Sequence, residues 1–516
     1  MWNNLRQLNR AELLSFKGVF YFTGSLLREG INLMAVVRFS AKRYPNKHAL
    51  VADDVRMTYS EMYVESKRLM AYYKEIEGFH PKQKVGLYFP NSASCLLHVF
   101  ALSRLGMEVL LINTELSPEQ VAALSKQQKL DQLIIDRSFA EKLTDLSGLR
   151  FLIFDETTVK FLKFQTKKRF HKPGRGSIGV MSGGTSGNFK AALRKPSVFR
   201  FLAPLLALLT ISRIHEKSAV IVTAPLFHGF GLSTSIVGFL LGKKVVIQER
   251  FTAKAIISSI ENETVEVLIA VPTIIQRLLE ENDPRLNRLE TIFTGGTRLS
   301  ARLSDRTLAQ LGPVLYNLYG SSEGGFSFMA TPADLTKFPG TIGKPLYGVK
   351  VKIDENNCLQ LKGSWKMTDN NAGYYDTKDL CSVNEAGCYF INGRYDDMII
   401  SGGENVHPQD VHDILITHES IRDVAVLGIP DETFGERLVA FIVVKNPNLS
   451  PEEILSWLKP KVARFQVPRE IVIVNEIPML NTGKLDKKKL LELSYVERVN
   501  QKSSSSSSSS NRRILR

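Results

Sequence analysis

The chain has 516 residues, 44% hydrophobic and 23% charged, a balance that excludes a largely disordered or fibrous protein and is ample for a packed interior. Because a single core stops growing near ~250–300 residues, more than one domain is expected. A net charge of +15 favours anionic partners such as polyphosphate ligands or anionic lipid, whereas nucleic acid is excluded as an expected partner, since no dense basic helix, zinc-finger spacing or RNA-binding aromatic motif occurs.

The first 34 residues precede the strand-like pattern and are expected to form an N-terminal extension. They hold an apolar run between Lys17 and Arg28 without a small-residue cleavage site, which argues against a signal peptide and is compatible with peripheral contact at a membrane. The four cysteines show no paired spacing, so the sequence predicts neither a disulfide framework nor a zinc site and favours the cytoplasm.

Short runs rich in β-branched residues recur between helical stretches and are apolar throughout rather than alternating. This pattern is typical of strands buried on both faces of a mainly parallel sheet. The runs are KVGLYF (84–89), VLLIN (109–113), LIID (133–136), AVIVTAP (219–225), KVVIQ (244–248), VLIAVP (267–272) and TIFTGG (291–296). The sequence therefore predicts an α/β fold with a large domain of mostly parallel sheets and helices.

The pattern changes in the last quarter of the chain. The runs DVAVLGIP, VAFIVV and EIVIV surround helical stretches and predict a small, mobile α+β domain over 396–498, after an N-terminal domain over 1–395. Helix starts are predicted at SPEQ (117–120) and SPEE (450–453), because each combines a cap, a first-turn proline and a capping-box residue. Residues 499–516 are rich in serine and are predicted to be disordered.

One loop is built for an anion. Residues 182–190 read SGGTSGNFK, in which glycines let backbone N–H groups converge, while hydroxyls donate and a lysine adds charge. The loop is not the common P-loop, because its lysine follows the last glycine by three positions. A surface linker is the competing interpretation.

Further motifs follow strand-like runs in a fixed order. They are TGGTRLS (294–300), NLYGSSEGG (317–325), GYYDTKDL (373–380), GRYDDMIISGGENVHP (393–408) and IPMLNTGKLDKKKL (477–490). Together with SGGTSGNFK they resemble the adenylate-forming superfamily of acyl-CoA synthetases, amino-acid adenylation domains and luciferases, over residues 35–493. The resemblance implies that ATP and Mg²⁺ activate a carboxylic acid as an acyl-adenylate, which then passes to a thiol.

Site residues are carried over only where the motifs match. The residues implied to bind ATP or AMP are Thr185, Ser186, Gly187, Lys190, Gly295, Gly296, Thr297, Tyr319, Gly320, Ser321, Ser322, Asp379 and Arg394. Among them, Tyr319 resembles the residue that packs on adenine, and Asp379 and Arg394 resemble the pair that binds the ribose. Glu323 resembles the Mg²⁺-binding carboxylate, which suits a cation that keeps water and phosphate oxygens as its other ligands.

Three further roles follow from the same resemblance. Lys484 resembles the mobile lysine that reaches the α-phosphate, and His228 resembles a histidine that orients the carboxylate, although a core histidine is an equally good interpretation of it. Asp396 resembles the hinge between two domain arrangements. The residues implied to line the thiol channel are Ser401, Gly402 and Gly403.

The acid and the acceptor are less constrained. Gly229, Gly231 and the apolar stretch GGFSFMA (324–330) indicate a hydrophobic pocket and favour a medium- or long-chain fatty acid over an aryl or amino acid. No carrier domain follows the small domain, so CoA is preferred over a carrier protein. The residues Gly183, Phe189 and Lys378 depart from the family pattern and motivate a rival hypothesis, a nucleotide-binding homologue without turnover.

Overall fold

A computed structural model describes most of the chain. The residues described are 13, 15–142, 150–155, 173–182, 190–194, 198–321, 324–363, 373–401, 404–431, 433–480 and 484–493. The serine-rich tail predicted over 499–516 lies outside them.

The chain forms two compact units. The first comprises Met1–Lys352, Gln360–Tyr375 and Asn384–Tyr389, and the second comprises Ile353–Leu359, Asp376–Val383 and Phe390–Arg516. The boundary between Tyr395 and Asp396 stays a prediction.

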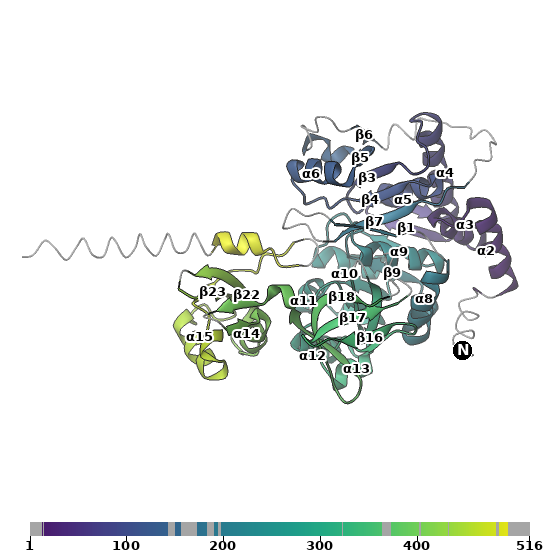
Figure 1. The fold of residues 1–516 in the computed structure, drawn as a ribbon. Coiled ribbons are helices and arrows are strands. Elements are labelled where there is room, and N and C mark those ends of the chain that lie inside the picture. Colours follow the sequence, from purple (N-terminus) through teal and green to yellow (C-terminus); the bar gives the residue numbers. More distant parts are fainter. Residues whose placement is uncertain are drawn as a thin grey trace, which may run out of the picture. The chain divides into compact units, whose positions relative to one another are not determined.

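Two sheets organise the first unit (Figure 1). One has nine strands in the order β15 (Lys344–Pro345), β14 (Gly325–Ala330), β13 (Leu315–Ser321), β12 (Thr291–Gly295), β11 (Val267–Ala270), β9 (Ala219–Val222), β10 (Lys244–Ile247), β1 (His48–Ala52) and β2 (Val55–Thr58). The other has six, in the order β6 (Phe151–Phe154), β5 (Gln132–Asp136), β3 (Lys84–Tyr88), β4 (Glu108–Leu111), β7 (Ser177–Ser182) and β8 (Lys190–Arg194). The central strands of both sheets pair in parallel, as the apolar runs predict.

Helices separate and cover these sheets. A shared apolar core, with side chains from both sheets, holds α3 (Leu33–Arg43), α4 (Tyr59–Glu75), α5 (Ala93–Leu105), α8 (Val198–Ser212) and α9 (Gly229–Leu240). The opposite face of the nine-stranded sheet packs on α10 (Ala253–Asn262), α11 (Pro272–Glu281), α12 (Ala301–Leu311) and α13 (Pro332–Lys337). The opposite face of the six-stranded sheet packs on α6 (Pro118–Gln128). Every residue of α5 is buried, which is why its sequence is mostly apolar, and its buried polar residues include Arg104.

Two further sheets follow. A four-stranded sheet has the order β16 (Lys350–Ile353), β17 (Cys358–Lys362), β18 (Tyr375–Val383) and β19 (Tyr389–Arg394). A five-stranded sheet in the second unit contains β21 (Glu404–Val406), β20 (Ile399–Ser401), β23 (Gly435–Val444), β22 (Ile421–Asp431) and β24 (Glu470–Ile473). One face of the latter packs on α14 (Pro408–Leu415) and α15 (Pro451–Leu458). The predicted fold class, a large domain of mostly parallel sheets and helices with a small α+β domain, is confirmed.

The two predicted helix starts are also confirmed. Ser117 caps α6 and Ser450 caps α15, each accepting a bond from the backbone N–H three residues on. In both helices the glutamine or glutamate at that third position bonds back to the cap, which completes a capping box.

Candidate active site

The carboxyl ends of neighbouring parallel strands gather three of the predicted motifs. Strands β9, β11, β12 and β13 are consecutive in the nine-stranded sheet, and Gly295 at the end of β12 lies opposite Leu318 of β13. His228 follows β9, and Tyr319 lies near the end of β13. Ligands of open α/β sheets bind beyond the carboxyl ends of the strands, so this edge is the candidate active site.

The loop of Gly295, Gly296 and Thr297, predicted to bind the nucleotide, turns away from the sheet directly after β12. Gly296 has φ +84°, a left-handed conformation that glycine adopts without a steric cost, and it is exposed. Thr297 follows it and is half-buried. The turn therefore leaves backbone groups accessible at the sheet edge, as a ligand-facing loop requires.

Aromatic packing fixes the position of Tyr319. Its ring makes an edge contact with Phe328 of β14 at 5.7 Å between centroids, and Phe328 contacts Tyr389 at 5.1 Å. Gly320 and Ser321 complete β13, and the Ser321 hydroxyl accepts a bond from the Gly324 N–H at 2.8 Å. The adjoining Ser322 and the proposed Mg²⁺ ligand Glu323 lie outside the described residues.

Two antiparallel strands frame the phosphate loop. Strand β7 ends at Ser182 and β8 begins at Lys190, and these two residues are paired in register. Thr185, Ser186 and Gly187 lie between them, outside the described residues.

His228 lies at the start of α9, where it is the N-cap residue. It is half-buried, with its ring 4.7 Å from that of Phe227. The Leu226 N–H in the same loop donates to the Asn91 side-chain oxygen at 2.8 Å, and Asn91 is itself buried. Asn91 follows β3 of the six-stranded sheet, so this bond ties the His228 loop to the other sheet.

The sequence-based reasoning overlooked Asn91. A polar PNS cluster directly after a buried strand was the available signal, because such clusters mark the ligand edge of α/β sheets.

Gly231, which was predicted to give room in a hydrophobic acid pocket, is required for backbone packing instead. A Cβ at this position would lie 2.4 Å from the carbonyl oxygens of both Ala224 and Pro225, so glycine is needed for the helix to pack against its own preceding loop. Phe328 and Met329, from the apolar stretch 324–330, belong to the buried core. These residues therefore do not indicate space for an aliphatic chain.

The proposed ribose pair comes together in the second unit. An Arg394 guanidinium nitrogen lies 3.4 Å from an Asp379 carboxylate oxygen, and a second lies 3.6 Å from Asp396. Asp379 is largely buried, and its backbone N–H donates to the Thr377 hydroxyl at 3.1 Å. The guanidinium and the carboxylate are thus held close enough to contact one pair of hydroxyls.

Lys378 stands in an unusual conformation beside this pair. Its φ is +61°, in the left-handed region where a glycine is favoured and where other residues are uncommon. Its ammonium pairs with Asp376 at 2.9 Å, and this hydrogen bond raises the pKa of Lys378. Lysine in place of the family's glycine therefore strains the backbone here, and its side chain forms an exposed ion pair with Asp376.

We expect the free energy of unfolding of Lys378→Gly to exceed that of Lys378→Ala by about 1 kcal/mol. Both variants lose the ion pair, and only glycine relieves the strain of the left-handed conformation. At Lys352, an exposed position within β16, the order should reverse by roughly 0.5–1 kcal/mol, because glycine weakens an extended strand. Denaturant unfolding of the four variants measures both differences. The same order at both sites would contradict the strain at Lys378.

The remaining predicted residues lie in the second unit. Asp396 is exposed and belongs to the 3₁₀ turn Tyr395–Asp397. Ser401 is buried at the end of β20, while Gly402 and Gly403 lie outside the described residues. Lys484 is exposed, and its carbonyl accepts a bond from the Leu480 N–H at 2.8 Å, next to the antiparallel bridge between Met479 and Leu485. These roles stay predictions.

The sheet edge is a candidate nucleotide site, and the chain belongs to the family of AMP-binding enzymes. The family model described as AMP-binding enzyme matches residues 37–364, and the model described as AMP-binding enzyme C-terminal domain matches residues 410–484. The predicted membership of the adenylate-forming superfamily is confirmed.

Curated relatives resemble the chain over nearly their whole length. The 2-succinylbenzoate–CoA ligase of Staphylococcus epidermidis is 26% identical over 476 residues, which cover 89% of this chain and 97% of that protein. The ligase of the same name from Oceanobacillus iheyensis is 27% identical and covers 86% and 95%. The predicted reaction class, an ATP-dependent, AMP-forming acid–CoA ligase, agrees with these relatives.

Solved structures share the fold. The o-succinylbenzoate CoA synthetase from Bacillus subtilis, in complex with its acyl-adenylate intermediate, has a TM-score of 0.76 and 24% identity, covering 88% of this chain and 98% of that one. ATP-bound MatB from Rhodopseudomonas palustris has a TM-score of 0.78 and 22% identity, covering 90% and 98%. The cofactor prediction is confirmed for the family, since adenylate-forming ligases use ATP, Mg²⁺ and CoA.

Proposed function

We propose that the enzyme joins an aromatic carboxylic acid to CoA in two half-reactions at the edge formed by β9, β12 and β13. First, a carboxylate oxygen attacks the α-phosphate of ATP, which forms an acyl-adenylate and releases pyrophosphate. Then the CoA thiol attacks the acyl carbon, which forms the thioester and releases AMP. The near full-length similarity to 2-succinylbenzoate–CoA ligases is the observation that carries this proposal.

The proposed ATP site combines the sheet edge with the phosphate loop. Tyr319 packs on adenine from a position that Phe328 already fixes, and the Gly296 turn leaves room beside it. The loop that ends at Lys190 holds the phosphates. Glu323 would hold a Mg²⁺ ion, which would offset the charge of the phosphates.

Charge placed on the α-phosphate is the proposed source of catalysis in the first half-reaction. Negative charge shifts toward pyrophosphate as it leaves, and stabilising developing charge is usually the largest catalytic contribution. Lys484, which is exposed, supplies the cation. In the second half-reaction, a turn at Asp396 brings Ser401 and the following glycines toward the thiol.

The proposed acid carries an aromatic ring, as in the relatives' named substrate. This replaces the preference for a fatty acid, whose support lay in Gly229, Gly231 and the stretch 324–330. Gly231 is needed for helix packing, and Phe328 and Met329 are fully part of the core. We further propose a cytoplasmic location, since the four cysteines are all free.

The acid class is tested by incubating the purified chain with ATP, Mg²⁺, CoA and a matched panel of acids, with the thioester identified by mass. The panel pairs 2-succinylbenzoate, benzoate and phenylacetate with saturated fatty acids of similar and greater size. The proposal expects kcat/KM for the best aromatic acid to exceed that of the best fatty acid by about tenfold or more. A fatty acid as the best substrate would contradict the aromatic assignment and leave the ligase reaction intact.

A further inference from the structure

The helix α2 (Phe16–Glu29) presents large apolar side chains to solvent. Phe16 is 89% exposed, Phe20 66% and Leu27 81%. At 100° per residue, these three positions lie within about 40° of one another around the helix axis. They therefore lie along one outward-facing line, with the exposed Thr23 between Phe20 and Leu27, and we call these three side chains the α2 stripe.

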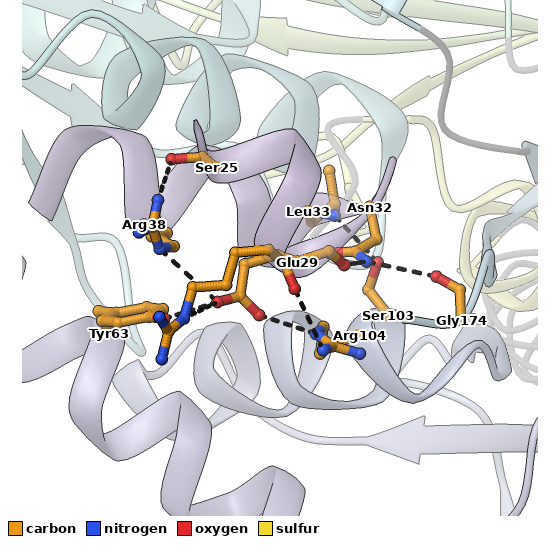
Figure 2. Close-up of polar contacts among 10 residues, drawn as sticks. Ser25, Glu29, Asn32, Leu33, Arg38, Tyr63, Ser103, Arg104 and Gly174 are labelled. Carbon is orange, nitrogen blue, oxygen red and sulfur yellow. Dashed lines mark hydrogen bonds and ion pairs between the residues drawn. The ribbon is translucent and has the colours of Figure 1, made fainter. Parts of the chain in front are cut away.

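The opposite face of α2 is fixed to the protein (Figure 2). Near the end of the helix, Glu29 bonds to Arg104 of α5 at 2.7 Å and accepts a bond from Tyr63 of α4 at 2.6 Å. Arg38 of α3 lies 3.8 Å from the same carboxylate and donates to the Ser25 hydroxyl at 3.0 Å. Because α2 is bonded to three other helices, it cannot rotate to bury the α2 stripe.

The charge beside the α2 stripe has one sign. Lys17 is exposed beside the stripe, Arg28 is partly exposed and lies 3.9 Å from Glu29, and Glu29, the single acidic residue of the helix, is buried. The whole chain has a net charge of +15. The surface therefore combines aromatic and aliphatic side chains with positive charge, which is the combination that binds an anionic lipid surface.

We propose that the α2 stripe docks the enzyme on an anionic membrane, with α2 lying in the plane of the surface. The helix has 14 residues and is about 21 Å long, too short for a hydrocarbon layer of ~30 Å. Among the described residues, every helix is likewise too short or too polar to cross a bilayer. Phe16 and Phe20 enter the boundary between headgroups and acyl chains, and Lys17 contacts lipid phosphates.

A second copy of the chain is a poorer occupant of this surface. A symmetric pair would place the same patch on both sides, so Lys17 of one copy would face a patch that offers it no acidic side chain from α2. Lipid phosphates supply the opposite charge instead. The charge pattern thus favours a membrane over self-association.

The test measures sedimentation of the full-length chain with vesicles. Two kinds are used, phosphatidylcholine alone and phosphatidylcholine mixed with phosphatidylglycerol. We expect binding to the anionic vesicles that weakens with added salt. The combined change Phe16→Ser, Phe20→Ser and Leu27→Ser should lower the affinity for anionic vesicles by more than about tenfold, because it removes the apolar side chains that the membrane would bury.

Tyr347→Ser is the matched control, because Tyr347 is 81% exposed on the first unit and lies outside α2. It should bind vesicles as the parent does, and both variants should keep the parent's ligase activity without vesicles. The proposal is overturned if the parent does not bind anionic vesicles or if the triple variant binds as tightly. It is also overturned if the triple variant only abolishes a concentration-dependent dimer, measured by analytical ultracentrifugation.

Discussion

Replacing Lys484 by alanine is expected to slow acid-dependent ATP–pyrophosphate exchange by about 10²- to 10³-fold, because the variant lacks the cation proposed to stabilise charge on the α-phosphate. Transfer of an acyl group from supplied acyl-adenylate to CoA should stay within about twofold of the parent, because the turn proposed at Asp396 presents Ser401 rather than Lys484 in that step. Both rates are measured on one preparation.

Lys488→Ala is the matched control for this variant. Lys488 is exposed in the same basic run, four residues further along the chain, and should leave both rates unchanged. ATP binding by the Lys484 variant is the test that the protein is folded. We expect it to be folded, because Lys484 is exposed and its bond with Leu480 joins backbone atoms that alanine keeps. Parallel losses in the two half-reactions, with ATP binding retained, would refute the assigned role.

Replacing Glu29 by alanine is expected to lower the free energy of unfolding of the first unit by about 3–5 kcal/mol, because it leaves a buried guanidinium without its carboxylate. The Glu29 side chain is 5% exposed and that of Arg104 is 7% exposed. Glu29 also lies near Arg38 and Arg28 and bonds to Tyr63, whose pKa is raised by burial and by this carboxylate (Figure 2).

Chemical denaturation, followed by a probe in the first unit, measures this loss. Glu65→Ala is the control, because Glu65 pairs with Arg68 on the exposed side of α4 and should cost no more than about 1 kcal/mol. An effect of Glu29→Ala as small as that of Glu65→Ala would show that α2 is not held by this carboxylate. The double change of Glu29 and Arg104 to apolar residues should recover part of the loss, because no buried charge is then left unpaired.

Local signals explain what the sequence predicted well. The runs that form β9, β11 and β12 are apolar on both faces, because helices cover both sides of the sheet. Their composition alone therefore indicates buried parallel strands. Their ends were less predictable. The run AVIVTAP yields a strand only over Ala219–Val222, since the chain leaves the sheet before Pro225, a residue with no N–H to donate.

Contacts between distant segments explain what the sequence did not reveal. Glu29 reads as an ordinary helix-end glutamate, and its role depends on Arg104, which lies 75 residues away. The bond between Asn91 and Leu226 likewise spans 135 residues and joins two sheets. The glycine at 231 reads as a pocket residue until the carbonyls of Ala224 and Pro225 are placed beside it.

Acid-dependent ATP–pyrophosphate exchange by the purified full-length chain tests the central claim most directly. We predict exchange that requires a carboxylic acid and Mg²⁺, and, once CoA is added, one AMP released for each thioester formed. Gly183, Phe189 and Lys378 depart from the family pattern without preventing turnover in this account. Nucleotide binding without exchange, over the whole panel of aromatic and fatty acids, would contradict the account and identify a homologue that has kept the fold but lost the reaction.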